Sequence, residues 1–401
     1  MYENNLQSSD LNKKPKSGRS KREAQGAIRE GLPKDVRRLV IKAGSRVLVD
    51  QHGRPDPVKI SGLVDQIADL HRCNYEVIFV SSGAIAAGVE SLGWPQRPVN
   101  LPDLQMAAAI GQGVLLNLYS GQLARHGCRI GQVLLTHADL NDRSRHLNAR
   151  NTIMAMLRNR IIPVINENDV VAVDEIRFGD NDLLAAMAST LIDADLLILL
   201  TTSDGLYHSE NGRLLERIPQ LDDITDETLS MAQGKGSSWS SGGMGSKLQS
   251  ADRAIRGGTP VVIANGNQDQ VLRRILDSED VGTLITGTSN QRKLNARKKW
   301  IAFFHRPQGS LYVDEGASSA ILDQGHSLLP VGVVRTEGRF KAGALVNIRD
   351  RNGKTLARGL TAYHRNDIER IKGLRSADIP FVLGERHFKE VIHRDNMVLV
   401  S

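Results

Sequence analysis

The sequence predicts an α/β protein in which an open, mostly parallel sheet is sandwiched by helices, with a small β-rich barrel after it. Three features predict this fold class. Short apolar runs alternate with amphipathic stretches up to about residue 290, as in a series of β-α-β units. Polar clusters follow several of these runs, where open α/β sheets place their binding sites. After a basic bridge, the pattern changes to short strand-like runs separated by glycine-containing turns.

The predicted strands of the large sheet are short apolar runs, which are typical of parallel strands covered on both faces. They are residues 39–42, 77–80, 132–135, 161–165, 196–200 and 260–263. The stretches between them carry apolar residues at helical spacing and predict the covering helices. These are residues 60–72, 104–126, 148–158, 182–192 and 247–256.

The chain is predicted to divide into four parts. Residues 1–35 are polar and rich in Lys, Arg, Ser and Asn, which indicates a disordered basic extension rather than a specific nucleic-acid arm. Residues 36–290 form the catalytic domain and residues 291–306 a basic linker. Because the bridge at residues 292–299 is poor in apolar residues, we expect few contacts to cross it. Residues 307–398 form the β-rich domain, with strand-like runs at 311–313, 331–335, 344–348 and 355–361.

Composition narrows the class of protein. The 401 residues carry a formal net charge of +7, which allows anionic small molecules or nucleic acid as partners. Cys73 and Cys128 are expected to be buried thiols rather than a disulfide or a metal site. No apolar run reaches bilayer length and no hydrophobic signal core is visible, so we expect a cytoplasmic protein without a membrane partner.

The most informative polar cluster follows the run 161–165. Residues 166–169 read Asn-Glu-Asn-Asp, and residues 179–182 read Gly-Asp-Asn-Asp just before a predicted helix. Such side chains can bind a small zwitterion and can steer lysines or a metal, but the cluster has no His or Cys at the spacing of a zinc site. Taken alone, the two clusters are equally compatible with turns that cap a strand and a helix.

Three further motifs lie at predicted junctions between elements. Residues 42–45 (Lys-Ala-Gly-Ser) place an ammonium beside exposed backbone N–H groups, at a spacing that excludes a Walker A loop. Residues 240–247 (Ser-Ser-Gly-Gly-Met-Gly-Ser-Lys) form a glycine-rich loop at a helix start, which can cradle phosphate. Residues 81–84 (Ser-Ser-Gly-Ala) can hold a carboxylate. A solvated lysine, a flexible loop and an N-cap serine are the plainer interpretations of each motif alone.

Taken in order, these motifs resemble the glutamate 5-kinase family, which has the amino acid kinase fold. The resemblance rests on residues 42–45, 81–88, 166–169, 179–182 and 242–248, and residues 313–317 and 327–332 resemble the PUA domain of many bacterial members. It covers about residues 37–398. It implies ATP-dependent phosphorylation of the L-glutamate γ-carboxylate to γ-glutamyl phosphate, the first step of proline biosynthesis, with Mg²⁺ carried by the ATP phosphates.

The resemblance also implies a role for each motif residue. Lys42 and Lys247 would stabilise the transferring phosphoryl group, and Asp182 would hold their ammonium groups in place. Glutamate would be bound by Ser82, Asp169 and Asn181. The residues implied to contact ATP are Lys42, Gly44, Ser45, Thr201, Thr202, Ser241, Gly242, Gly243, Met244, Gly245, Ser246 and Lys247. Because the acceptor carboxylate is already ionised at neutral pH, catalysis needs positioning and charge neutralisation rather than a general base.

The chain departs from the family pattern in two places. Arg46 stands where the family has a small Ser or Thr, and Thr201 is followed by Thr202, Ser203 and Asp204 where the family has Thr-Asp. Asp204 is therefore a candidate substitute for the family aspartate. The resemblance further implies a homo-oligomer, a dimer or a tetramer, and feedback inhibition by L-proline, for which the loop at 170–177 is the candidate sensor.

Three other functions stay open at this point. Another amino acid kinase, acting on N-acetylglutamate, aspartate or carbamate, would share the fold, but the PUA-like tail and residues 166–169 argue against it. An RNA-binding or RNA-modifying protein would fit the basic charge and the PUA-like domain, yet the first 290 residues show no catalytic domain of that kind. A regulatory protein with an inactive kinase fold is disfavoured because Lys42, Lys247 and Asp182 are all present.

Overall fold

The computed structural model confirms the predicted fold class, a large α/β unit followed by a β-rich unit. It describes residues 32, 36–172, 181–210, 213–231, 243–287, 301, 307–384 and 388–400. Apart from residue 32, the predicted basic extension lies outside the described residues, as do nearly all of the predicted linker and residues 173–177 of the candidate proline sensor.

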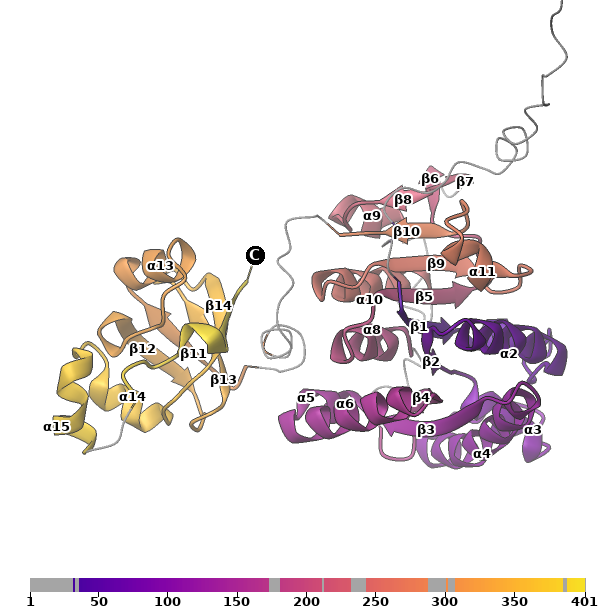
Figure 1. The fold of residues 1–401 in the computed structure, drawn as a ribbon. Helices are drawn as coiled ribbons and strands as arrows, with labels where there is room; N and C mark the ends of the chain where they lie inside the picture. Colours follow the sequence, from indigo (N-terminus) through magenta and orange to yellow (C-terminus); the bar gives the residue numbers. More distant parts are fainter. Residues whose placement is uncertain are drawn as a thin grey trace, which may run out of the picture.

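The first unit is built on an eight-stranded sheet (Figure 1). In sheet order its strands are β3 (Arg129–Leu135), β4 (Ile161–Glu167), β2 (Glu76–Val80), β1 (Arg38–Ala43), β5 (Leu196–Thr201), β9 (Val261–Asn265), β10 (Thr283–Ile285) and β8 (Gln220–Leu221). The first six run parallel and are the six strands predicted from the sequence. β10 runs antiparallel to β9 and was not predicted, because a three-residue strand is too short to give an apolar pattern.

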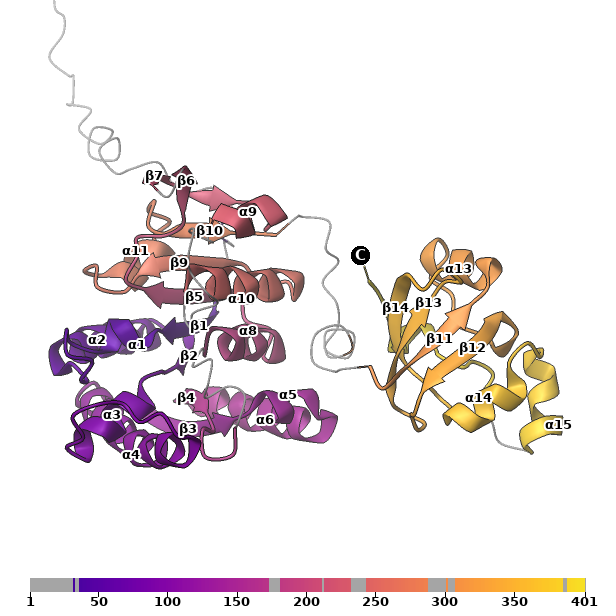
Figure 2. The same cartoon turned by 180° about the vertical axis from the view of Figure 1, so that it is seen from behind.

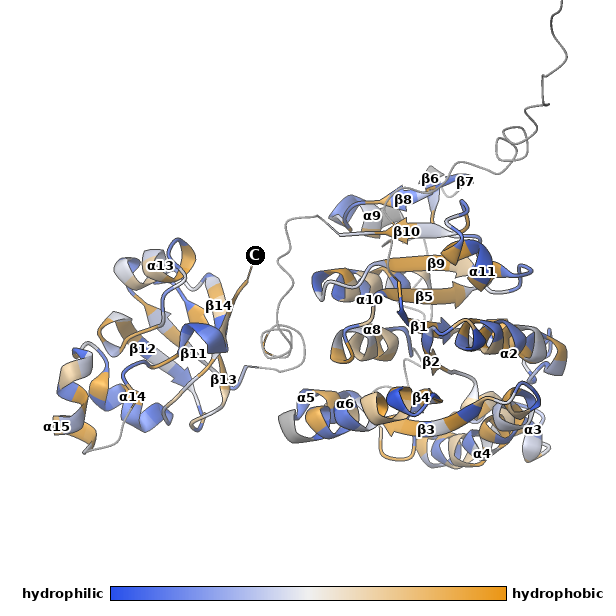
Figure 3. Cartoon of the chain, in the orientation of Figure 1, coloured by the Kyte–Doolittle hydropathy of each residue, from blue (hydrophilic) through white to orange (hydrophobic). Residues whose placement is uncertain are grey.

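Helices cover both faces of this sheet, and alternation of side chains along the strands divides the core in two (Figures 1 and 2). Val40 and Ile78 point to one face, whereas Leu39 and Phe79 point to the other. The first face is covered by α5 (His137–Asn141), α6 (Arg143–Arg158), α8 (Asn181–Leu191) and α10 (Met244–Arg256). The second is covered by α1 (Ser45–Leu48), α2 (Pro57–Arg72), α3 (Ala84–Ser91), α4 (Leu101–Arg125) and α11 (Val271–Leu276). Figure 3 shows β5 and β9 as apolar strands between these layers.

The remaining elements of the first unit lie near the β8 edge of the sheet. They are the antiparallel pair β6 (Tyr207–Glu210) and β7 (Arg213–Arg217), and helix α9 (Asp226–Met231). None of the helices that the structure describes combines the length and the apolar character needed to span a bilayer. Cys128 is buried as predicted, but Cys73 is exposed. The prediction for Cys73 is wrong because this residue caps the carboxyl end of α2 instead of lying within the helix.

Helices α3 and α4 pack with almost no space between their backbones. A Cβ atom at Gly88 would lie 1.8 Å from the carbonyl oxygen of Ala107, and one at Gly111 would lie 1.7 Å from that of Ala84. Any side chain at either glycine would therefore force the helices apart. Gly88 is the last residue of the motif at 81–88, so this end of the motif serves helix packing.

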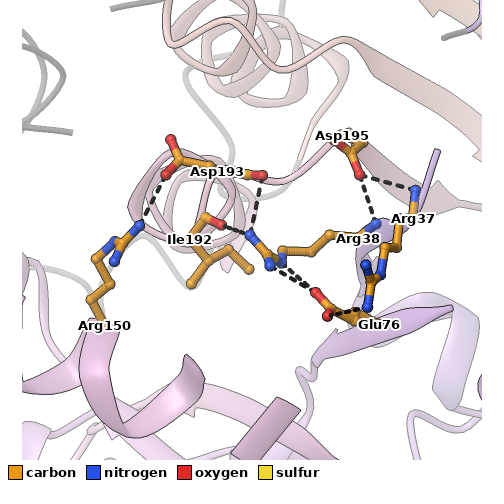
Figure 4. Close-up of polar contacts among 7 residues, drawn as sticks. All are labelled: Arg37, Arg38, Glu76, Arg150, Ile192, Asp193 and Asp195. Atoms are coloured by element: carbon orange, nitrogen blue, oxygen red, sulfur yellow. Dashed lines mark hydrogen bonds and ion pairs between the residues drawn. The ribbon is translucent and has the colours of Figure 1, made fainter. Parts of the chain in front are cut away.

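The amino ends of the central strands are held by a polar network (Figure 4). The Asp195 carboxylate accepts from the backbone N–H of Arg38 at 2.8 Å, and the Arg38 side chain donates to Glu76 at 2.8 Å. Arg38 also donates to the carbonyl of Asp193 at 3.5 Å, and Arg150 donates to the Asp193 carboxylate at 3.0 Å. Cations at a helix C-terminus satisfy carbonyls that the helix leaves open. The network therefore fixes the carboxyl end of α8. The amino end of this helix lies at the carboxyl ends of the strands.

The second unit contains a five-stranded sheet with helices, which confirms the predicted β-rich domain. Its strands, in sheet order, are β12 (Val333–Gly338), β11 (Gly309–Val313), β13 (Leu345–Arg349), β14 (Thr355–Leu360) and β15 (Met397–Leu399). Its other elements are α13 (Glu315–Leu322), η1 (Pro330–Gly332), α14 (Arg365–Ile371), η2 (Ser376–Asp378), α15 (Ile379–Leu383) and η3 (Arg394–Asn396). The strand predicted at 331–335 starts only at Val333, because the chain first makes the 3₁₀ turn η1.

One apolar cluster continues from the first unit into the second. It joins Ile301, which is fully buried, to the core around α8 and α10 and to Leu345 and Leu360. Leu345 and Leu360 are cross-strand neighbours on β13 and β14, so they form one apolar patch. Apolar contacts therefore join the two units through Ile301, which follows the basic bridge at residues 292–299.

Candidate active site

Three charged side chains from three elements meet beyond the carboxyl end of β1. Lys42 lies on the face of β1 that α8 and α10 cover, since it follows Val40 by two residues. Asp182 lies in the first turn of α8, and Lys247 lies in the first turn of α10. The order of the sheet thus brings together residues that are up to 205 positions apart, from Lys42 to Lys247.

The carboxylate of Asp182 bridges the two lysines. Its Oδ1 lies 2.5 Å from Lys42 Nζ, and its Oδ2 lies 2.7 Å from Lys247 Nζ. The side chain of Asp182 is fully buried, and those of Lys42 and Lys247 are 4% and 5% exposed. The structure therefore brings together the three residues that the sequence nominated for catalysis, while their catalytic roles stay predictions.

This arrangement favours an anionic ligand. The three side chains carry two positive charges and one negative charge, and buried charges are costly unless they are compensated. Lys247 also lies at a helix amino end, where the helix dipole opposes a cation and favours an anion. A phosphate group near the two ammonium groups would offset both costs.

Gly44 and Ser45 lie directly after β1. The Gly44 N–H donates to the carbonyl of Leu200 on β5 at 3.1 Å, and a Cβ atom at Gly44 would lie 3.3 Å from that oxygen. Gly44 therefore keeps the end of β1 close to β5. Ser45 begins α1 and is exposed, as is Arg46, so both side chains are accessible to a ligand or to solvent.

The predicted glutamate residues lie at the ends of β2 and β4 and at the start of α8. Ser82 is 8% exposed, and within the described part of the chain its Oγ has no hydrogen-bond partner. Since buried hydroxyls are nearly always hydrogen-bonded, a ligand is the natural partner of this one. Gly83 follows with φ of 92°, a left-handed turn that leads into α3. Asp169 lies half-buried just beyond β4.

The predicted ATP residues lie beyond β5 and at the start of α10. Thr201 ends β5 and is half-buried, whereas Thr202 is exposed. Asp204 accepts hydrogen bonds from Asn265 at 2.9 Å and from Gln268 at 2.7 Å, so it is tied to the end of β9. The described part of the glycine-rich loop begins at Gly243, the N-cap of α10, and continues through Met244, Gly245 and Ser246 to Lys247. Ser241 and Gly242 lie outside the described residues.

Sequence reasoning missed two residues beside this site. Gln112, in the middle of α4, donates to the carbonyl of Glu167 at 3.1 Å and accepts from Asn166 at 3.1 Å. Asn166 in turn accepts from Asn181 at 2.5 Å. Gln112 belongs to no motif, so only the packing of α4 against β4 reveals it. Asn166 stood in a recognised motif but had been given no role.

Comparison with known protein families identifies the type of domain that each unit forms. Residues 37–265 match the amino acid kinase family, and residues 309–383 match the PUA domain. The first unit is therefore an amino acid kinase domain, and the candidate active site lies within it.

Curated relatives define the particular family. A glutamate 5-kinase of Carboxydothermus hydrogenoformans is 45% identical over 92% of this chain and 99% of its own length. A glutamate 5-kinase of Syntrophus aciditrophicus is 45% identical over 93% of this chain and 96% of its own. The chain belongs to the glutamate 5-kinase family. Among solved structures, a UMP kinase from Bacillus anthracis is 18% identical with a TM-score of 0.44, over 62% of this chain and 96% of that one.

Proposed function

We propose that the protein transfers the γ-phosphoryl group of ATP to the γ-carboxylate of L-glutamate. The observation that carries this proposal is the Asp182 carboxylate between Lys42 and Lys247. It lies beyond the carboxyl ends of the central strands, where Ser82 and Asn181 also lie. Membership of the glutamate 5-kinase family supports the choice of acceptor.

The chemistry follows from charge. A carboxylate and a polyphosphate repel each other, so the barrier falls when cations lie along the transfer path. Lys42 on β1 and Lys247 on α10 supply two ammonium groups, and the Asp182 carboxylate holds both in position. The carboxylate oxygen forms the new P–O bond as the bond to the ADP oxygen breaks, and the nucleophile has no proton to lose.

Magnesium is proposed to enter with the nucleotide. Within the described ranges, no group of three or more His, Cys, Asp or Glu side chains is placed to hold a metal ion. Phosphate oxygens are preferred ligands of Mg²⁺, which commonly keeps few protein contacts. The bound ion would neutralise phosphate charge during transfer.

The direct test is an ADP-release assay with Mg-ATP and L-glutamate, N-acetylglutamate or L-aspartate as acceptor. ADP release is expected with L-glutamate alone, and hydroxylamine should trap the acyl phosphate product as the hydroxamate. Equal turnover with N-acetylglutamate would refute the assignment and favour the alternative amino acid kinase.

Variants of the lysines test the mechanism. Lys42→Ala and Lys247→Ala should each lower kcat by roughly a hundredfold, as expected for a lost transition-state contact. Arg256→Ala is the matched control, because Arg256 lies at the far end of α10 in an exposed ion pair with Asp252. An effect of either lysine variant on KM alone would contradict the proposed role.

Regulation and assembly are part of the proposal. We propose that L-proline inhibits at or beside the glutamate pocket, so that its inhibition weakens as glutamate rises. Inhibition that ignores glutamate would point to a separate site. We also propose a cytoplasmic homo-oligomer, a dimer or tetramer, that light scattering would detect.

RNA binding by the PUA domain is a second candidate function. Arg335 lies 3.8 Å above the Tyr312 ring, and the two residues form a cation–π pair across the neighbouring strands β12 and β11. Filter binding with tRNA across a salt series tests it, because nonspecific basic binding falls steeply with salt.

A further inference from the structure

One face of the PUA sheet, whose strands lie side by side in Figure 2, points away from the domain's own core. Leu311, Val346 and Ile348 point into that core, so the residues that alternate with them along the strands point to the opposite, outer face. The polar residues of the outer face include Tyr312, Arg335, Asn347, Arg349 and Arg358.

Three arginines from three strands gather on the outer face. Tyr312 on β11 pairs with Arg335 on β12 and with Arg349 on β13, so the two arginines flank one ring. Arg358 on β14 pairs with Asn347, which lies two residues before Arg349 on the same face. Direct and diagonal neighbours at this spacing are within reach of long side chains. Arg335, Arg349 and Arg358 therefore form an arginine row across the sheet.

The arginine row is partly removed from water and carries an excess of positive charge. Arg349 and Arg358 are half-buried, and within the described residues the buried Nε of Arg349 has no hydrogen-bond partner. Buried polar groups nearly always have a partner, and a buried charge is costly without compensation. Glu337 is the only acid among the described strand residues of this face. Its carboxylate accepts from Tyr312 Oη at 2.7 Å and lies 3.9 Å from Arg335.

A fourth arginine approaches the row from the catalytic unit. Burial lowers the pKa of Arg253 on α10, and the charge of Arg358 lowers it further, so these two guanidinium groups are close enough to repel each other. Leu345 and Leu360, at one end of the outer face, join the apolar core around α8 and α10. Like charges therefore meet where the two units join, and an anion between them would offset the repulsion.

The chemistry of this face favours a small anion that carries phosphate groups. Planar guanidinium groups donate pairs of hydrogen bonds to phosphate oxygens. Single-stranded RNA is bound largely through bases that stack on open aromatic rings. Here Arg335 lies 3.8 Å above the Tyr312 ring, and Tyr312 is only 9% exposed. An RNA strand would therefore find phosphate contacts on this face but no ring on which a base could stack.

We propose that Arg349 and Arg358, together with Arg253 of the catalytic unit, bind a small polyphosphate anion between the PUA domain and α10. The bound anion stabilises the contact between the two units, because it pairs with arginines from both. The site is separate from the candidate active site, since none of its three arginines was nominated for catalysis or for binding glutamate or ATP.

Equilibrium dialysis of the full-length protein against labelled inorganic pyrophosphate tests the site. A saturating, non-hydrolysable analogue of ATP fills the candidate active site, and one pyrophosphate per chain should still bind. Arg349→Ala and Arg358→Ala should each raise the Kd about tenfold or more, because hydrogen bonds between charged groups are lost. Arg349→Lys keeps the charge but loses the planar pair of donors, and should raise the Kd about threefold.

Arg375→Ala is the matched control. Arg375 is exposed and follows α14, which packs against the core face of the sheet through Ile368 and Ile371. This variant removes the same charge from the same domain and should leave the Kd within about twofold, since an exposed distant charge is screened. Circular dichroism checks the fold of each variant, and Arg349→Lys takes the place of Arg349→Ala if the latter does not fold.

Three outcomes would overturn the proposal. The first is an absence of pyrophosphate binding when the ATP analogue is present. The second is equal weakening in Arg375→Ala, because binding would then depend on net charge alone. The third is a short single-stranded RNA that binds more tightly than pyrophosphate and whose binding is abolished in Arg349→Ala, since the outer face would then belong to RNA.

Discussion

Replacing Asp182 by asparagine removes one charge from the centre of the candidate active site and changes its shape little. The substitution leaves Lys42 and Lys247 facing a neutral amide, although both ammonium groups were within 2.7 Å of a carboxylate oxygen. Removing one partner of a buried ion pair costs about 3–5 kcal/mol, because the remaining charges stay desolvated. For a unit of this size, that loss lowers Tm by about 10 °C.

Catalysis should suffer as well, since the two lysines lose the group that fixes their positions. We expect Asp182→Asn to lower kcat by about a hundredfold, comparable with the loss of one transition-state contact. Bound phosphate can supply the missing negative charge between the ammonium groups. Mg-ATP should therefore raise the Tm of the variant by more than it raises that of the parent protein.

Scanning calorimetry with and without Mg-ATP, together with ADP release, measures both effects. Asp193→Asn is the control at the other end of α8, where the ion pair with Arg150 is partly exposed and worth at most about 1 kcal/mol. The reasoning would be refuted by a kcat within threefold of the parent value. A Tm deficit that Mg-ATP leaves unchanged would refute the idea that the site is built for an anion.

Three further predictions concern the frame around the site. Gly111→Ala should lower the free energy of unfolding by about 2 kcal/mol in a urea titration, because its Cβ would lie 1.7 Å from the Ala84 carbonyl oxygen; an unchanged midpoint would contradict the close packing. Burial lowers the pKa of His146 from 6.5 to about 4. As pH falls through 6.5, the unfolded chain therefore binds a proton that the folded chain refuses, and stability should fall by about 3 kcal/mol between pH 6.5 and 4. His146→Gln should flatten that part of the pH profile, and an equal slope in the variant would assign the loss to other groups. A chain ending at residue 288 removes Ile301, Leu345 and Leu360 from the cluster around α8 and α10, so its Tm should fall, while turnover of L-glutamate should persist because all candidate catalytic residues precede the cut. A folded but inactive truncated protein would mean that the PUA domain helps to build the site.

The six parallel strands were predictable because strands buried on both faces have short apolar sequences. Lys42, Asp182 and Lys247 were predictable because each lies in a recognised motif at a strand or helix end. Contacts between residues distant in the sequence were harder to predict. Gln112 lies in mid-helix without a motif, and its role depends on which residues of β4 lie beside α4. Ile301 lies in a short apolar run, residues 300–304, directly after the basic bridge, and nothing local indicates that it joins the core of the first unit to strands of the second. Pattern reveals elements and motif residues, whereas contacts between distant segments appear only once the chain is folded.

The contact between Gly88 and Gly111 has a consequence for how the motif at 81–88 should be used. The two ends of the motif differ in role, since Ser82 is a candidate glutamate contact, whereas Gly88 packs against the backbone of a neighbouring helix. A protein engineer who wished to change the acceptor would alter the serine and keep both glycines. Transplanting the eight residues into another scaffold would fail without Gly111 of α4, because α3 and α4 can pack this closely only with a glycine on each helix.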